Sequence, residues 1–475
     1  MTEETKKNKL WAMSRTSQIF EGSLSPFPTD NCFTLSFCVL LSTGAFALGW
    51  MGYYANYTAT PYFYKGNLAV IAVFFVLYFV CARIYDTFKL SISRVSELIY
   101  SAVLAAVISD AVMYLVIVLL CKRFPSVLPM VGVLALQAAG TSLWALLAHR
   151  WYFAINPPKK AIIVWDMRKG LDELIHAYGL SARYQVMGTP RIEECLRNLE
   201  KHIDGMDAVF LSGIHSHDRN IVIKYCVRHD VDAYIIPRVG DAVMSAARSL
   251  HLFHLPVMKL ERYNPAPEYF FFKRFFDVLL SAMALVILSP VMLAVAAAIK
   301  LTDGGTVFYR QKRLTKDGKV FEVLKFRSMR MDAEKDGVAR LSTGARDDRI
   351  TPVGRFIRAC RIDELPQLLN IFRGDMAIVG PRPERPEIAA QYEEELPEFA
   401  LRLQAKAGLT GYAQVYGQYN TTPYDKLLMD LMYIAKPSLA EDFKICFATV
   451  KILFMPESTE GVSEGQTTAM GGEKH

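Results

Sequence analysis

Four long apolar stretches in the first third of the chain constrain its fold more than any other feature. They cover residues 32–54, 68–85, 98–121 and 128–147. Each is close to the roughly 20 residues that an α-helix needs to cross a bilayer. Only helices and closed barrels satisfy their own backbone hydrogen bonds inside a bilayer. We therefore predict a multi-domain membrane protein with a four-helix transmembrane bundle at residues 32–150.

Basic residues beside these stretches predict which side of the membrane each end faces. With residues 1–31 as a cytoplasmic N-terminal segment, the lysines and arginines on the inner side are Lys6, Lys7, Lys9, Arg15, Arg83, Lys89, Arg94, Arg150, Lys159 and Lys160. Those on the outer side are Lys65, Lys122 and Arg123. The positive-inside rule therefore predicts that the chain continues on the cytoplasmic face. Asp110 lies within the third stretch, where a functional role and pairing with a neighbouring helix both stay open.

Length, charge and cysteine pattern narrow the function classes. A chain of 475 residues is too long for one ordinary core, so two or three domains are expected. The net charge of +7 suits partners that carry phosphate, such as anionic lipids and nucleotides. The eight cysteines form no CxxC pair and no zinc-ligand spacing, which indicates reduced thiols in a part that faces the cytosol.

Residues 155–260 have the pattern of a small α/β domain. Short β-rich runs at 161–165, 208–211 and 233–236 alternate with helical patterns, which predicts a Rossmann-like parallel sheet. A dinucleotide site would carry GxGxxG after its first strand, and the run from Trp165 to Gly170 lacks it. We therefore predict a regulatory or assembly module, with a homodimer contact as one role for it.

A fifth apolar stretch, residues 270–300, has basic residues at both ends. Lys273 lies near its start and Lys300 at its end, so both ends are expected on the cytoplasmic side. Ser289 and Pro290 fall inside the stretch, and a proline within a helix removes a hydrogen bond and bends it. We predict a re-entrant membrane helix broken at this pair, with Ser289 satisfying freed backbone groups. The alternative is an ordinary fifth span that tolerates its proline.

Residues 268–456 are expected to form a mainly α catalytic domain, and the polar tail 457–475 to be disordered. The densest group of charged and turn residues lies at 346–387, where an amphipathic helix is predicted to carry Asp363 and Glu364. Adjacent helical residues point about 100° apart, so the two carboxylates could flank one site. One would act as nucleophile while the other binds a cation, for which Mg²⁺ is the natural choice. A solvated helix face explains the pair equally well on composition alone.

The motifs around this pair resemble a known enzyme superfamily. The run Arg358-Ala-Cys-Arg-Ile-Asp363-Glu364-Leu-Pro-Gln-Leu-Leu-Asn370 is followed by Gly374-Asp-Met376 and Gly380-Pro-Arg-Pro383. Together they look like the signature of the monotopic phosphoglycosyl transferases, the bacterial sugar transferases that prime polysaccharides on a polyprenyl lipid. Further matching segments lie at 309–313, 325–329, 408–414 and 430–433. The N-terminal half resembles that of the large hexose-1-phosphate transferases in this superfamily.

The resemblance implies a two-step transfer at the inner membrane of a bacterium. Asp363 would attack the β-phosphorus of a UDP-sugar, release UMP and form a covalent aspartyl-phosphosugar, as covalent catalysis requires. Undecaprenyl phosphate, or another polyprenyl phosphate, would then accept a hexose-1-phosphate, with glucose or galactose as the sugar. Glu364 would coordinate Mg²⁺. This would be the first membrane step in the synthesis of an exopolysaccharide, capsule or O-antigen.

The same resemblance assigns the remaining site residues. Those implied to bind phosphate or substrate are Arg358, Arg382, Lys325, Arg327, Arg313, Pro381 and Pro383. Arginine suits this role because its forked donors match phosphate oxygens. Two other interpretations stay open: Arg358 as an anchor to anionic membrane lipid, and the two prolines as residues that only shape a rigid loop.

Two rival functions are weighed against the enzyme. A catalytically inactive membrane scaffold or regulator of polysaccharide assembly would have no need for both Asp363 and Glu364, and both are present. Nucleic-acid binding is not expected, because the basic C-terminal half lacks the aromatic residues that interleave in base-stacking motifs. The sequence therefore favours the transferase.

Overall fold

The computed structural model describes residues 32–60, 62–91, 93–177, 180–263, 265–330, 349–417 and 421–453. The predictions for residues 1–31 and 457–475 lie outside these ranges. By its backbone contacts the chain divides into two compact units, of which the first holds residues 1–159 and 175–185. The second holds residues 160–174 and 186–475. Each unit is described by itself.

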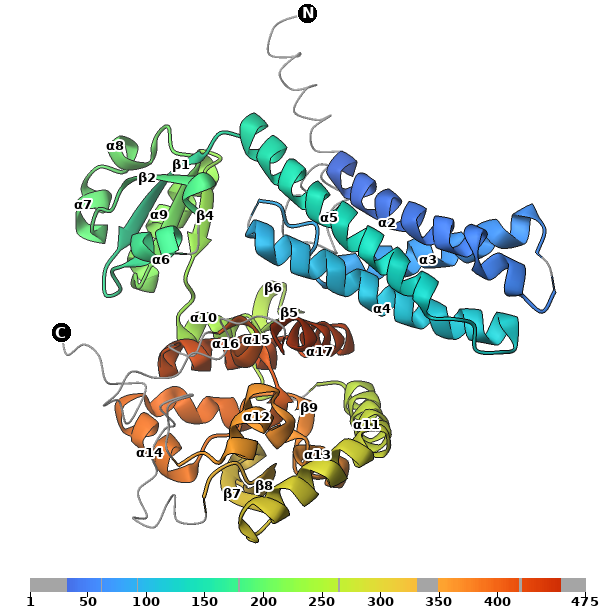
Figure 1. The fold of residues 1–475 in the computed structure, drawn as a ribbon. Helices are drawn as coiled ribbons and strands as arrows, with labels where there is room; N and C mark the ends of the chain where they lie inside the picture. The colour runs from blue at the N-terminus through green and yellow to red at the C-terminus, as the bar shows by residue number, and fades with distance from the viewer. Residues whose placement is uncertain are drawn as a thin grey trace, which may run out of the picture. The chain divides into compact units, whose positions relative to one another are not determined.

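The first unit is built from apolar helices, drawn in blue to teal in Figure 1. They are α2 (Cys32–Gly52), α3 (Tyr64–Ile84), α4 (Val95–Cys121) and α5 (Leu128–Ile155), with the short η1 (Tyr54–Tyr57) after α2. Helix α2 packs on α3 and α5, and α4 packs on the same two helices. By length and composition alone, α3, α4 and α5 could each cross a membrane. The prediction of apolar helices in this region is confirmed.

The interior of this unit combines stacked rings with a polar contact. The rings of Phe46 and Phe74 stack with their centroids 4.2 Å apart. Asp110 is 3% exposed, and the amide nitrogen of Gln137 on α5 donates to its Oδ1 at 3.4 Å and to the Ser42 carbonyl at 3.3 Å. Of the two interpretations left open for Asp110, these contacts favour pairing with a neighbouring helix.

A four-stranded sheet forms the centre of the α/β module. Its strands are β1 (Lys159–Trp165), β2 (Tyr184–Gly188), β3 (Ala208–Ser212) and β4 (Asp232–Ile235), and they lie in the order β2-β1-β3-β4. Strand β3 pairs in parallel with both β1 and β4. The surrounding helices are α6 (Leu171–Ala177), α7 (Ile192–Arg197), α8 (Leu199–Ile203) and α9 (Ser216–Arg228). The predicted mixture of strands and helices is confirmed, although β2 was not predicted.

The rest of the second unit is mainly helical, as predicted. After α10 (Val239–Met244) come an antiparallel hairpin, β5 (Arg248–Leu252) and β6 (Leu255–Lys259), and the long helix α11 (Pro267–Asp303). The elements that follow are β7 (Phe308–Leu314), η3 (Lys316–Gly318), β8 (Val320–Phe326), α12 (Pro352–Ala359), η5 (Ile362–Glu364), α13 (Gln367–Arg373), β9 (Ala377–Val379), α14 (Pro386–Glu395), η6 (Pro397–Gln404), β10 (Gly408–Thr410), α15 (Tyr412–Tyr416), α16 (Pro423–Ala435) and α17 (Leu439–Leu453).

Helix α11 departs from its prediction in one respect. Its backbone stays helical through Pro290, so the helix is not interrupted at Ser289-Pro290 as expected; it changes direction along its length instead (Figure 1). A proline removes one hydrogen bond, which here frees the carbonyl of Val286. The Ser289 hydroxyl donates to that carbonyl at 2.8 Å. Because the freed group is satisfied, the helix continues past the proline.

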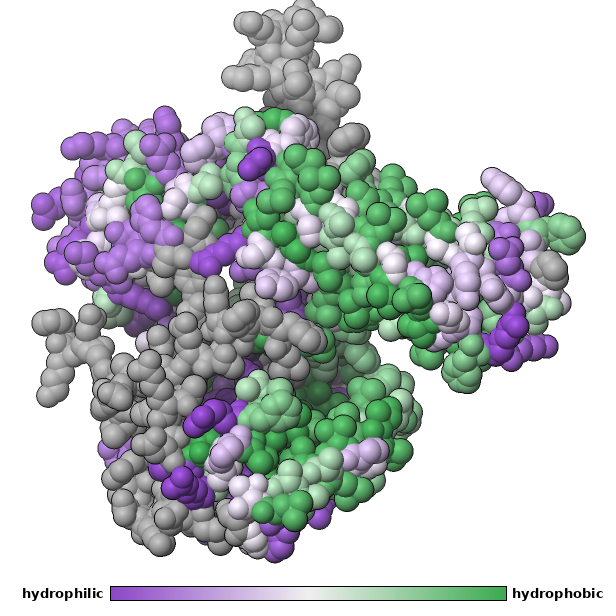
Figure 2. All heavy atoms as spheres, viewed as in Figure 1, coloured by the Kyte–Doolittle hydropathy of each residue, from purple (hydrophilic) through white to green (hydrophobic). Residues whose placement is uncertain are grey.

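Large apolar side chains are exposed along α11. They include Met283, Val286, Ile287, Val291 and Leu293, of which Val286 is 74% exposed. Figure 2 shows this helix, at the lower right of the view, as a mostly hydrophobic surface. By length and composition α11 is also able to cross a membrane. An apolar surface of this extent marks a contact with lipid or another protein.

Candidate active site

Asp363 and Glu364 lie in a short 3₁₀ turn, and the predicted single helix through them is wrong. Helix α12 ends at Ala359, the turn η5 covers Ile362–Glu364, and α13 begins at Gln367. Arg361 between α12 and η5 has a left-handed backbone with φ of 54°. A non-glycine residue in this region breaks an α-helix and is enriched at functional sites. The pair is therefore presented by a turn between two helices.

Helix α12 is anchored at both of its ends. Thr351 caps its start by accepting a hydrogen bond from the Gly354 amide at 2.9 Å. Gly354 is pressed against the carbonyl of Ser328, where any side chain would overlap it. Near the other end, Ile357 packs with Phe326 and with Val295 of α11. These contacts place the turn that carries the carboxylates beside the end of β8 and the second half of α11.

Strand β8 is fixed to α13 by the buried side chain of Asn370. Its Oδ1 accepts from the Leu324 amide at 3.0 Å, and its Nδ2 donates to the Glu322 carbonyl at 2.8 Å. Because residues alternate along a strand, the neighbouring Lys325 is directed toward η5. Its Nζ donates to Oε1 of Glu364 at 2.8 Å. Asn370 thus positions the lysine that pairs with the site.

Glu364 is held as a carboxylate by surrounding cations. Its side chain is 21% exposed and lies 4.0 Å from Nη2 of Arg382, in addition to the Lys325 contact. Burial on its own would raise the pKa of Glu364, but the charges of Lys325 and Arg382 outweigh it and hold the pKa at about 2. Glu364 is therefore ionised at any physiological pH.

The surroundings of Asp363 shift its pKa in the opposite direction to that of Glu364. Burial raises the pKa of Asp363 above its usual value, and the adjacent charge of Glu364 raises it further. The cations Lys325 and Arg358 act against this rise. Within the described ranges no lysine, arginine or histidine forms an ion pair with the Asp363 carboxylate, whereas Glu364 has two such partners. A poorly solvated carboxylate without an ion-pair partner is a suitable nucleophile.

Arg358 is the nearest candidate for binding an incoming anion. Its Nη1 is buried and makes no hydrogen bond with any residue in the described part of the chain. A buried donor without a partner is costly unless a ligand satisfies it. Together with its influence on Asp363, this orphaned donor fits the predicted role in phosphate binding, which stays a prediction.

The loop at residues 380–384 is held by close backbone contacts with β10. The Gly380 amide donates to the Thr410 carbonyl at 2.8 Å, and the Gly408 amide donates to the Pro381 carbonyl at 2.9 Å. A side chain at Gly380 or Gly408 would overlap the other strand's backbone. Only glycine permits this approach. The two glycine-containing motifs of the sequence therefore meet to aim Arg382, which is half exposed, at Glu364.

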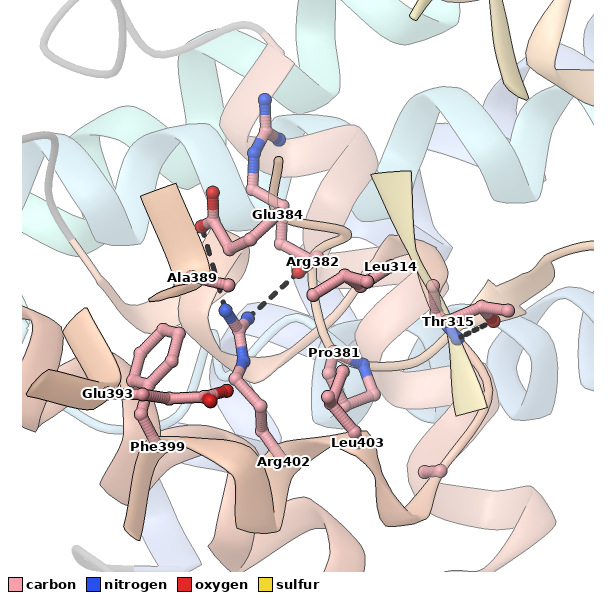
Figure 3. A pocket seen from close by; sticks show the side chains of 12 residues that line it. Leu314, Thr315, Pro381, Arg382, Glu384, Ala389, Glu393, Phe399, Arg402 and Leu403 are labelled. Atoms are coloured by element: carbon pink, nitrogen blue, oxygen red, sulfur yellow. Dashed lines mark hydrogen bonds and ion pairs between the residues drawn. The ribbon is translucent and has the colours of Figure 1, made fainter. Parts of the chain in front are cut away.

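Two buried arginines support the same loop from behind. Arg313 donates from Nη1 to the Pro383 carbonyl at 3.0 Å and from Nη2 to Oε1 of Gln311 at 2.7 Å. Arg402 donates to the Arg382 carbonyl at 2.9 Å and forms an ion pair with Asp430 at 2.6 Å. Figure 3 shows Arg402 between Glu384 and the backbone of Arg382. The cavity there measures about 10 Å³, the room of about one water molecule. It is too small for a sugar.

The predicted site residues thus fall into three groups. Lys325, Arg358 and Arg382 lie around the carboxylates, as expected. Arg313, Pro381 and Pro383 belong to the loop and its support. Arg327 is 7% exposed and its guanidinium lies against Gly305, just after α11. Sequence reasoning missed Arg402, because a buried arginine outside any quoted motif has no local signal.

The carboxylates can supply only part of a metal site. Within the described residues no group of three or more His, Cys, Asp or Glu side chains could hold an ion. Mg²⁺ commonly uses one or two carboxylates together with substrate phosphates and water. Glu364 is ionised, and one of its oxygens is free of the Lys325 contact. The residues therefore fit a magnesium ion that arrives with a diphosphate.

Comparison with known proteins identifies the family of the region that contains this site. The family model for bacterial sugar transferases matches residues 268–456. A UDP-glucose:undecaprenyl-phosphate glucose-1-phosphate transferase of Caulobacter vibrioides is 42% identical over 191 residues, which are 39% of this chain and 71% of the relative. The chain belongs to the bacterial sugar transferase family. Asp363, Glu364 and each residue that surrounds them lie within the matched region.

Two further relatives extend the comparison. A UDP-N-acetylgalactosamine-undecaprenyl-phosphate N-acetylgalactosaminephosphotransferase of Aeromonas hydrophila is 36% identical over 231 residues, 48% of this chain. The match spans about half of that relative's length, 53%. An exopolysaccharide production protein, PSS, of Rhizobium leguminosarum bv. phaseoli is 41% identical over 187 residues, which are 38% of this chain and 92% of the relative.

Proposed function

We propose that this bacterial sugar transferase moves a hexose-1-phosphate from a UDP-sugar to undecaprenyl phosphate, with Asp363 as the nucleophile. The observation that carries the proposal is the contrast between the two neighbouring carboxyls. Glu364 is bound by Lys325, while Asp363 is desolvated and has no ion-pair partner in the described residues. The names of the relatives support the substrate class, since two of them act on undecaprenyl phosphate.

The first step forms a bond between Asp363 and the sugar phosphate. A carboxylate oxygen attacks the β-phosphorus, the bond from this phosphorus to the bridging oxygen breaks, and UMP leaves with that oxygen. In the second step an oxygen of undecaprenyl phosphate attacks the same phosphorus and releases Asp363 as a carboxylate. Dividing the transfer in two means that nucleotide sugar and lipid need not occupy the site together.

The surrounding cations have distinct tasks in this scheme. Arg358 directs a buried, unpartnered donor toward the incoming phosphate, and Arg382 extends from its loop above Glu364. Both supply charge where the transition state becomes more negative. Lys325 keeps Glu364 ionised, so that the second carboxylate stays available as a ligand. When bound with the diphosphate, Mg²⁺ would neutralise its charge, and Glu364 is the residue that would hold the ion.

We infer that the protein resides in the bacterial inner membrane with its catalytic domain on the cytoplasmic face. In this arrangement α2–α5 form the four-helix transmembrane bundle, and the four-stranded sheet with its helices is a Rossmann-like module. The positive flanking charges and the apolar helices support this topology.

Helix α11 is proposed to enter and leave the membrane on the same side. In its first half, Lys273 bonds to Asp442 on α17 at 2.8 Å, and in its second half Ile299 packs with Phe326 and Ile357. A straight helix of 37 residues would extend about 55 Å, yet both halves contact one domain. This favours a re-entrant helix over a fifth span.

The names of the relatives indicate the class of sugar but not one particular sugar. One is named for glucose and another for N-acetylgalactosamine. We propose a hexose, with glucose first among the candidates. The resemblance to an exopolysaccharide production protein supports a role in the first membrane step of surface polysaccharide synthesis.

Release of UMP by the purified full-length protein tests the proposal. With UDP-glucose, undecaprenyl phosphate and Mg²⁺ we expect turnover, and we expect Asp363→Asn to abolish it. Glu387→Gln is the matched control, because Glu387 is an exposed carboxylate on α14. A phosphosugar trapped on the wild-type protein in the absence of lipid, and missing in Asp363→Asn, would identify the intermediate. Continued turnover by Asp363→Asn would exclude Asp363 as the nucleophile.

A further inference from the structure

The carboxyl edge of the module's sheet is where a doubly wound α/β domain normally binds a ligand. In the order β2-β1-β3-β4, β2 lies on one side of β1, and β3 and β4 lie on the other. The chain therefore changes the direction in which it adds strands, and this topological switch point lies between β1 and β3. Ligands bind outside the carboxyl ends of strands at such points. The loops in question are those that follow Trp165 and Ser212.

In this protein the two loops are bonded to each other. The amides of Asp166 and Met167 donate to the carbonyls of Ser212 and Gly213, at 3.2 and 3.4 Å. The Ser212 hydroxyl donates to the Arg168 carbonyl at 3.0 Å. Gly213 has φ of 65° and lies so close to Arg168 that a side chain there would be crowded. Backbone amides that could otherwise bind a phosphate are therefore already used.

The side chain of Arg168 instead reaches the catalytic domain. Its Nη1 and Nη2 donate to Oδ1 and Oδ2 of Asp425 at 2.7 and 2.9 Å, a paired geometry of two parallel bonds. Asp425 lies in the first turn of α16, where its amide donates at 3.1 Å to the hydroxyl of Thr422, the residue that caps the helix. Arg168 thus binds the residue that organises the start of α16.

A second set of contacts joins the module to the same helix. Arg219 on α9 forms an ion pair with Asp241 on α10, and Ala242 of α10 is buried in one core cluster with Leu427 and Leu431 of α16. The start of α16 is therefore held from two directions. A polar contact fixes its first turn and an apolar contact fixes its body.

Helix α16 is tied to the loop of residues 380–384 by Arg402, which pairs with Asp430 of α16 at 2.6 Å and donates to the Arg382 carbonyl at 2.9 Å. Lys426 is half-buried, and burial lowers its pKa while the nearby charge of Glu384 opposes that effect. Arg382 also acts on Lys426. The helix that Arg168 contacts at its first turn therefore also supports the loop of residues 380–384 through Asp430 and Arg402.

We propose that Arg168 is a positioning residue: by binding Asp425, it docks the module on the first turn of α16 and so steadies the loop that carries Arg382. The docking is independent of the enzyme's activity. The effect on substrate rests on the proposed function, because it requires Arg382 to contact the nucleotide sugar. The module then acts as a structural part of the active site.

Hydrogen exchange in the full-length protein tests the docking without any substrate. Arg168→Asp is expected to speed exchange at residues 166–170 and in the first turn of α16 by roughly five-fold, the factor expected for losing one half-buried ion pair. The double variant Arg168→Asp with Asp425→Arg restores the pair and should restore protection. Lys169→Ala is the matched control, because Lys169 lies over the Trp165 ring within the module. Unchanged exchange in Arg168→Asp, or no recovery in the double variant, would overturn the docking.

Kinetics of UMP release test the positioning. We expect Arg168→Asp to raise the KM for UDP-glucose several-fold with little change in kcat, and the double variant to recover. An unchanged KM in a variant whose exchange shows that docking is lost would refute the positioning role. If the wild-type protein releases no UMP, the proposed function and the positioning of Arg382 fail together, whereas the exchange experiment still decides the docking.

Discussion

The Ser289 hydroxyl donates to the Val286 carbonyl at 2.8 Å, and this carbonyl is the one that Pro290 leaves without its helical donor. A side chain thus replaces the missing backbone bond one residue before the proline. The replacement matters because an unsatisfied carbonyl in a bilayer costs several kcal/mol. On the proposed topology serine and proline act together, since proline bends α11 and serine satisfies the freed carbonyl within the membrane.

Replacing the proline is predicted to change the topology of α11. In Pro290→Ala the backbone amide at residue 290 can bond to Val286, so the bend is no longer required. A straightened α11 would carry the catalytic domain across the membrane. A topology reporter fused after Lys300 should move from a cytoplasmic to a periplasmic signal.

Ser289→Ala is the control for this change, because it keeps the proline and removes only the hydroxyl. We expect the reporter to stay cytoplasmic and the protein to lose about 1 kcal/mol of stability. A periplasmic signal from the fusion to the wild-type chain would contradict the re-entrant helix itself.

The pH dependence of UMP release should move in opposite directions in two variants. Attack requires ionised Asp363, so activity is lost as the pH falls through its raised pKa. Arg358 lowers that pKa, and Arg358→Met should move the acid limb of kcat/KM to higher pH. Glu364 raises it, and Glu364→Gln should move the limb to lower pH. If the acid limbs of the two pH profiles shift in the same direction, or do not shift, Asp363 is not the titrating group.

Glu364 should also make the free energy of unfolding depend on pH. Its pKa is about 2 in the folded protein, below the ordinary value of 4.5, so its ionised form stabilises the fold. That contribution is present above pH 4.5 and disappears as the pH falls toward 2. Lys325→Met removes the bonded cation, which raises the pKa of Glu364 in the folded protein. The loss of stability with falling pH should therefore be smaller in this variant. Thermal unfolding of both proteins between pH 3 and pH 6 measures the difference.

The contact between Gly380 and Gly408 is predicted to tolerate no side chain. Gly408→Ala would force a methyl group into the backbone at Gly380, and we expect a loss of about 2–4 kcal/mol together with loss of UMP release. Gly240→Ala is the matched control, since a methyl group at this helical glycine meets nothing within 4 Å. It should be neutral or stabilise by up to about 1 kcal/mol. Equal melting temperatures for the two variants would contradict the close approach.

The buried pair Arg402 and Asp430 offers a test of the loop's support. Asp430→Asn removes the nearer of the two carboxylates that pair with buried Arg402 and leaves Glu384 at 3.6 Å, so we expect destabilisation of about 3 kcal/mol, the lower end for a broken buried pair. The double variant Arg402→Met with Asp430→Leu should recover much of this stability. It should not recover activity, because Arg402→Met removes the hydrogen bond from Arg402 to the Arg382 carbonyl.

The sequence predicted which charged residues lie near the carboxylates better than it predicted the backbone that carries them. Asp363, Glu364 and the cations around them could be named from motifs, because such residues cluster in the chain. Their turn could not be predicted, since Arg361 adopts a left-handed backbone that is usually signalled by glycine or asparagine. The pattern of apolar residues on both sides favoured one continuous helix instead.

Long-range pairs could not be predicted from local patterns. Arg168 and Asp425 are separated by 257 positions, and neither has a neighbour that marks it. Arg402 is 3% exposed, although an arginine considered by itself predicts a surface residue. In the apolar segments, by contrast, local sequence patterns were sufficient for the prediction. There composition alone determines the helices, and Ser289 could be assigned its role because a proline frees a known carbonyl.

The exposed apolar face of α11 has a consequence for how the two substrates reach the protein. A catalytic turn attached to a helix embedded in one leaflet stays at a fixed depth. On the proposed function, the lipid acceptor then arrives by lateral diffusion within a plane, and the nucleotide sugar arrives from the volume of the cytosol. The two encounters depend on different concentrations, one per unit area and one per unit volume. Membrane composition can therefore alter the second half-reaction without affecting the first.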